Sequence, residues 1–95
     1  MRGAHASTIV SVRVVYLARL REAFGRASET LELQADAATS VESVIAALRD
    51  RGGAWADELA QGRAVRFAVN HRLARRDHVV ADGDEVAVLP PVTGG

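Results

Sequence analysis

The sequence predicts an α+β domain in which a mixed β-sheet packs on one main helix. Segments that alternate apolar and polar residues stand on both sides of a single stretch with helical periodicity. A chain of 95 residues, 48% of them apolar, can build one domain with a modest core. We therefore expect residues 8–89 to form that domain, with a disordered extension at residues 1–7 and a flexible tail at residues 90–95.

The first part of the chain predicts two strands joined by a short helix. Residues 9–17 read as a strand because one side of the alternation is wholly apolar. Residues 18–24 can form a short helical turn, which Gly25 would end. Residues 28–33 alternate again and predict a second strand. The apolar side of the first strand consists of Val10, Val12, Val14 and Tyr16.

The main helix is predicted to begin at Thr39. Thr39 and Glu42 have the spacing of a capping box, in which each side chain satisfies a backbone N–H at the start of the helix. Gly52 and Gly53 are expected to end it. Its apolar positions follow the spacing of one buried stripe, which consists of Val41, Val44, Ile45 and Leu48.

The remainder predicts a second short helix over residues 54–60 and a strand over residues 65–69. A short strand around Leu73 would complete a hairpin, and the last strand spans residues 86–89 after a turn at residues 82–84. If the first and last strands are parallel neighbours, the main helix lies in the crossover between them. That arrangement is the β-grasp, or ubiquitin-like, fold.

Composition narrows the chemistry that the chain can perform. The absence of cysteine excludes disulfides, thiolate metal sites and thiol nucleophiles, and is typical of a cytoplasmic protein. The net charge is zero, which gives no general attraction to nucleic acid or to an anionic membrane. His5, His71 and His78 lack metal-ligand spacing, so no metal site is expected. We find no catalytic constellation within the chain and expect no bound cofactor.

The C-terminal residues form a stiff base followed by a thin end. Pro90 and Pro91 fix their φ angles and favour an extended backbone, which ends the preceding strand. Gly94 and Gly95 carry no side chains, so a terminal carboxylate at Gly95 could pass through a narrow channel. Such an end suits insertion into the active site of another protein, although many chains simply fray into glycine-rich ends.

Four motifs of the chain are Val14 to Glu22, Ala68-Val69-Asn70, Asp82 to Ala87 and Pro90-Pro91-Val92-Thr93-Gly94-Gly95. Together they resemble the small subunit of molybdopterin synthase, a ubiquitin-like sulfur carrier. The resemblance covers roughly residue 8 to the end of the chain. It departs from the family at Leu17 and Leu89, where relatives commonly have bulky aromatic residues.

The resemblance implies a role for the tail. In the family an ATP-dependent activating enzyme adenylates the terminal glycine, here Gly95, and persulfide sulfur from a sulfurtransferase converts it to a thiocarboxylate. That sulfur is donated to cyclic pyranopterin monophosphate in the large subunit, with which the small subunit forms a hetero-oligomer. Gly94 and Thr93 would then line the channel, and Val92 and Pro91 would position the tail. The small subunit itself is implied to be non-catalytic.

A docking face can be predicted from the strands without the family. If the first and last strands are parallel neighbours, their carboxyl ends coincide, and four apolar side chains share the face away from the helix. An exposed apolar patch of this kind usually binds a partner. The alternatives are that the loop after the first strand covers the face, or that the alternation is shifted by one residue. The patch consists of Val15, Leu17, Ala87 and Leu89.

Other functions remain open at this point. A carrier for thiamine, cysteine or tRNA thiolation would share the same chemistry, and a ubiquitin-like interaction module would never have its tail activated. Arg72, Arg75 and Arg76 form a small basic cluster near the predicted hairpin. The cluster is either a solvated surface or a region that steers an acidic partner.

Overall fold

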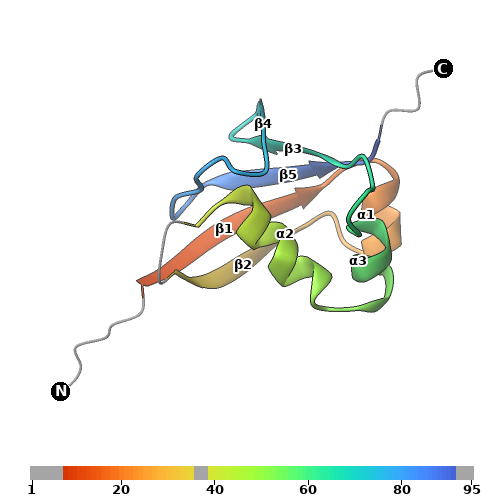
Figure 1. Ribbon diagram of the computed structural model, residues 1–95, viewed down its shortest axis with the longest axis horizontal. Helices are drawn as coiled ribbons and strands as arrows, with labels where there is room; N and C mark the ends of the chain where they lie inside the picture. The colour runs from red at the N-terminus through yellow and green to blue at the C-terminus, as the bar shows by residue number, and fades with distance from the viewer. Residues whose placement is uncertain (1–7, 36–38, 92–95) are drawn as a thin grey trace.

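A computed structural model describes residues 8–35 and 39–91 of the chain. The fold is a five-stranded mixed sheet with three helices, as Figure 1 shows. The strand order is β2-β1-β5-β3-β4. The elements are β1 (Thr8–Tyr16), α1 (Arg19–Phe24), β2 (Ser28–Ala35), α2 (Val41–Arg49), α3 (Gly53–Glu58), β3 (Arg66–Val69), β4 (Arg72–Ala74) and β5 (Glu85–Leu89).

The two central strands come from opposite ends of the chain. β1 pairs with β5 in parallel, and Tyr16 is the register partner of Val88. All other pairings are antiparallel: β1 with β2, β3 with β5 and β3 with β4. The parallel pair needs a long crossover, and α2 and α3 lie within it. The predicted β-grasp fold is therefore confirmed.

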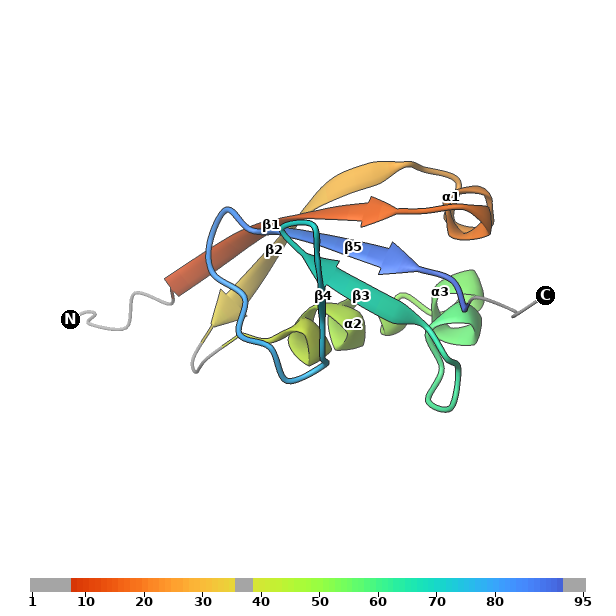
Figure 2. The same ribbon diagram turned by 90° about the horizontal axis from the view of Figure 1, so that it is seen from above.

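The core lies between the sheet and α2. Figure 2 shows α2 and α3 on the same side of the sheet. The predicted helix stripe is fully buried, as are the inward side chains of the central strands. Leu31 and Leu33 of β2 pack against this core at its edge. Alternation therefore predicted the inner face correctly for β1, β2 and β5. The central inward residues are Val12, Val14, Tyr16, Val86 and Val88.

The prediction that Thr39 caps α2 is wrong. Ser40 is the N-cap, because its hydroxyl accepts from the Ser43 N–H while the Ser43 hydroxyl accepts from the Ser40 N–H. Thr39 is buried and lies one residue outside the helix. Its carbonyl oxygen accepts a hydrogen bond from the Val80 N–H over 2.8 Å. The Thr39 carbonyl oxygen therefore bonds to the segment before β5, whereas the Ser40 carbonyl oxygen accepts from the Val44 N–H of the helix.

Smaller shifts affect the other boundaries. α2 ends at Arg49, before the two glycines that were expected to stop it. Gly52, with a φ of 78°, is instead the N-cap of α3, a conformation that favours glycine. Val65 lies just outside β3. Among the described residues, no helix is long and apolar enough to cross a membrane.

A charged and aromatic network closes one end of the core. Tyr16 donates its hydroxyl to the Glu29 carboxylate, which also accepts two hydrogen bonds of 2.8 Å from Arg51. The Arg51 guanidinium lies over Trp55, whose ring stacks on Phe24 at 4.0 Å. Burial, and then the bond to Glu29, raise the pKa of Tyr16 far above its usual value. The network thus ties β1 and β2 to the helices.

Candidate functional site

The predicted reacting end of the chain lies outside the described residues. Val92, Thr93, Gly94 and Gly95 fall beyond residue 91, so their predicted roles stay predictions. Pro91 is described and is partly buried after the end of β5. Figure 1 places that end of β5 at the same end of the sheet as α1. β5, the strand that precedes the tail, is the middle strand of the sheet.

One row of small and apolar residues crosses four strands on the face away from α2. Val15 of β1 is the register partner of Ala87 in β5, and Ala87 is the partner of Ala68 in β3. Ala68 is in turn the partner of Leu73 in β4. Register partners lie side by side with their side chains on one face, so these four side chains form a continuous row.

Two leucines extend this row toward the base of the tail. The Leu17 N–H donates to the Val88 carbonyl oxygen over 3.1 Å, which continues the parallel pairing beyond β1. Leu89 is the last residue of β5. The face is open, since Leu17 is 38% exposed and Leu73 is 68% exposed. We call these six residues the outer apolar face: Val15, Leu17, Ala68, Leu73, Ala87 and Leu89.

The structure brings the four predicted patch residues together and adds two that were missed. The alternation in β1 and β5 was read correctly, although Ala87 itself is largely covered at 9% exposure. Ala68 and Leu73 were missed because the hairpin register was not worked out. The two-residue turn at Asn70 and His71, both with positive φ, fixes that register and could have placed Leu73 on this face.

The turn before β5 holds the central strands in register. Ser11 donates its N–H to the Asp82 carboxylate, and the Gly83 N–H donates to the Ser11 carbonyl oxygen over 2.7 Å. Asp84 accepts from the Ala81 N–H and from the Asn70 amide. These two bonds hold the pKa of Asp84 below its usual value. The carboxylates of this turn therefore have structural partners.

Charged residues border the outer apolar face rather than interrupt it. Arg13 and Glu85 are register partners, two residues before Val15 and Ala87 in their strands. The Arg13 Nε atom lies 3.9 Å from the Glu85 carboxylate. On the other side, Arg66 is the register partner of Leu89. Within residues 8–35 and 39–91, no group of His, Cys, Asp or Glu side chains could hold a metal ion. The described part of the site is thus an apolar surface with a polar border, as in protein interfaces.

The chain is similar to known proteins along most of its length. A model of the ThiS family matches residues 14–95. The molybdopterin synthase sulfur carrier subunit of Escherichia coli is 39% identical over 84 residues, which cover 88% of this chain and 99% of that protein. The corresponding subunit of Haemophilus influenzae is 37% identical over the same shares of the two chains.

The fold also matches solved structures. The solution structure of the small archaeal modifier protein 1 from Methanosarcina acetivorans has a TM-score of 0.70 and 27% identity. The match covers 93% of this chain and 99% of that chain. The similarity in sequence and in fold therefore spans nearly the whole of each protein.

Proposed function

The chain belongs to the ThiS family, and we infer that it is the sulfur carrier subunit of a molybdopterin synthase, acting in molybdenum cofactor biosynthesis. The observation that carries this function is the 39% identity to a curated carrier along 99% of that carrier's length. The family match also runs through residue 95, so it includes the Gly94-Gly95 pair. A sulfur carrier subunit implies a large subunit as its partner.

The proposed chemistry takes place at the Gly95 carboxylate. A carboxylate oxygen attacks the α-phosphorus of ATP on an activating enzyme, and pyrophosphate leaves. The terminal persulfide sulfur of a sulfurtransferase then attacks the acyl carbon and displaces AMP, which gives an acyl disulfide. A thiol cleaves the S–S bond and releases the thiocarboxylate. Gly94 and Thr93 would line the large subunit's channel, with Val92 and Pro91 as positioning contacts.

The domain contributes binding rather than catalysis to this scheme. The outer apolar face lies beside the end of β5, which leads directly into Pro90 and Pro91. A partner that covers Leu17 and Leu89 would therefore contact the chain at the base of the tail. The apolar side chains give affinity by leaving water, and the adjacent tail is thereby delivered to the partner's active site.

Reconstitution with the large subunit tests the function. The thiocarboxylated chain, mixed with the large subunit and cyclic pyranopterin monophosphate, is expected to yield molybdopterin, detected by mass spectrometry. The same chain without Gly95 is expected to yield none. Failure of the thiocarboxylated chain, with the large subunit shown to be active on another carrier, would contradict this function.

A further inference from the structure

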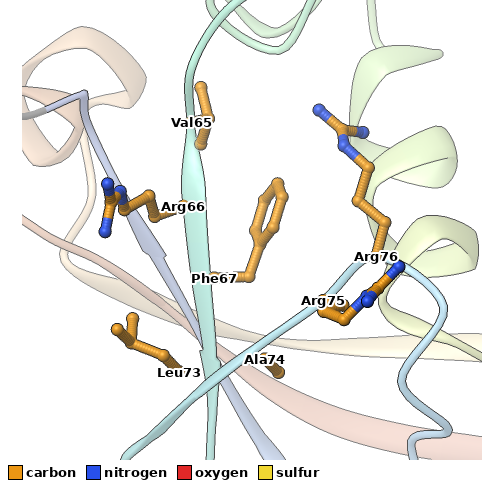
Figure 3. A pocket seen from close by; sticks show the side chains of 7 residues that line it. All are labelled: Val65, Arg66, Phe67, Leu73, Ala74, Arg75 and Arg76. Carbon is orange, nitrogen blue, oxygen red and sulfur yellow. The ribbon is translucent and has the colours of Figure 1, made fainter.

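A cavity opens where β3 and β4 separate. The two strands pair only from Phe67 with Ala74 to Val69 with Arg72, and β4 ends at Ala74. The chain then diverges, which leaves a cavity of about 300 Å³ between residues 65–67 and 73–76. Figure 3 shows Arg66 and Leu73 on one side of β3, and Phe67, Arg75 and Arg76 on the other. The cavity therefore spans the edge of the sheet.

The lining of this cavity is strongly basic. It includes three arginines, Arg66, Arg75 and Arg76, and no acidic residue, although the chain as a whole has no net charge. Only Arg76 is firmly held: its guanidinium lies 2.9 Å from the Glu42 carboxylate and 5.2 Å from the Phe67 ring. The cavity is thus a local concentration of positive charge.

The other two arginines are available to a ligand. Arg75 approaches Asp77 at 3.6 Å, but the two side chains are 90% and 79% exposed, so water screens this pair. Arg66 has no ion pair with any described residue. Either guanidinium could therefore bind a carboxylate at little cost to the fold.

Part of the backbone at the cavity also has no hydrogen-bond partner among the described residues. In an antiparallel ladder, successive residues direct their N–H and C=O groups to alternate neighbours. Phe67 and Val69 pair toward β4, so the Val65 groups point to that side as well, where β4 has already ended. Among the described residues, the Val65 backbone makes no hydrogen bond. An edge of this kind can pair with an added extended segment.

The cavity is continuous with the outer apolar face. Leu73 belongs to both, and Arg66 is the register partner of Leu89. A partner that covers the outer apolar face therefore reaches the cavity without a gap. Since this partner is the large subunit, the inference rests on the proposed function.

We propose that the large subunit places an extended acidic segment in this cavity, where its backbone pairs with Val65 and its carboxylates meet Arg66 and Arg75. The charge of the lining selects acidic side chains, and the free edge selects an extended polypeptide. Charge complementarity at a border of this kind steers the encounter and fixes the orientation of the two proteins. The outer apolar face would supply most of the affinity.

Titration calorimetry of the full chain with the purified large subunit from the same organism tests this inference. The R66Q/R75Q variant is expected to bind about tenfold more weakly at low salt and to show a weaker dependence of affinity on salt. The matched control R21Q/R63Q removes two exposed arginines that do not line the cavity, and is expected to bind within about twofold of the natural chain. In hydrogen exchange, the Val65 amide of the natural chain should exchange at least about tenfold more slowly in the complex.

The outcomes separate the inference from the function. If R66Q/R75Q binds like the control and the Val65 amide stays unprotected while the natural chain binds, the inference is overturned and the proposed function stands. Equal protection of Val65 by a single-stranded oligonucleotide would overturn the choice of an acidic polypeptide. If the natural chain does not bind the large subunit at all, the inference and the proposed partner both fail.

Discussion

Val15 of β1 and Ala87 of β5 are register partners in the parallel central pair of the sheet. Because these strands run in the same direction, their carboxyl ends lie at the same end of the sheet. Leu17 follows the first strand there, and Leu89 closes the second. The pairing therefore places an apolar surface from the start of the chain beside the segment that carries the tail.

Replacing Leu17 by aspartate tests the outer apolar face. Leu17→Asp is expected to weaken binding to the large subunit by at least about 30-fold, because a charge would be buried where an apolar contact forms. Its urea midpoint should stay close to that of the natural chain, since Leu17 is already 38% exposed. Calorimetry and urea unfolding measure the two effects.

The matched control for this change is Ile9→Asp. Ile9 is another large apolar residue of β1 and is 51% exposed, but it lies at the opposite end of the strand from Leu17. We expect it to change affinity by less than about twofold. Similar losses in both variants would argue against a localised docking face.

The start of α2 offers a test by stability. Ser40→Ala is expected to lower the free energy of unfolding by about 1 kcal/mol, because the Ser43 N–H loses its acceptor. Thr39→Val keeps the shape of a side chain whose hydroxyl bonds to no described residue, and should cost less than half as much. A larger loss for the Thr39 variant in urea unfolding would show that the cap was assigned to the wrong residue.

The partly buried carboxylate of Glu29 is expected to stabilise the fold. Glu29→Gln should lower the free energy of unfolding by about 2 kcal/mol, since Arg51 loses its charged partner and Tyr16 a strong acceptor. Glu32→Gln removes a carboxylate from the same strand, at an exposed position, and should change stability by less than about 0.5 kcal/mol. Equal losses of stability in the two variants would contradict a stabilising role for the contacts of Glu29 with Arg51 and Tyr16.

The same carboxylate predicts a dependence of stability on pH. Hydrogen bonds from Arg51, and then from Tyr16, hold the pKa of Glu29 below its ordinary value of 4.5. The folded state thus binds fewer protons than the unfolded state, so the contribution of Glu29 is complete above pH 4.5 and is lost as the pH falls through the lowered pKa. The stability gap between the natural chain and Glu29→Gln should narrow in acid. A stability gap that stays constant as the pH falls from about 6 to about 3 would contradict this.

Local patterns predicted the helices and strands and which side chains of each strand face inward. Tertiary contacts decided the cap of α2 and the contacts between distant residues. Val12 and Val14 could be placed on the inner face because alternation in a strand is strict. The cap could not be predicted, because Thr39 and Ser40 are both good capping residues and only the contact of Thr39 with Val80 separates them. Arg51 reaches Glu29 across 22 positions of sequence, which no local pattern reveals.

The outer apolar face was predictable in part for the same reason. The positions of Leu17 and Leu89 on this face follow from the alternation of side chains in two well-defined strands. Leu73 stands in a strand of three residues, too short for alternation to be informative, and its place depends on the turn at Asn70 and His71. The cavity at residues 65–67 arises from the separation of two strands, which is a property of the packed sheet alone.

The intact mass of the chain tests the central claim most directly. The purified chain would be incubated with ATP, the activating enzyme and the sulfur source of its own host. We expect a gain equal to the exchange of one oxygen for one sulfur, absent when ATP is omitted or Gly95 is deleted. An unchanged mass, with the same enzymes competent on another carrier, would contradict the account and indicate an interaction module whose tail is not activated.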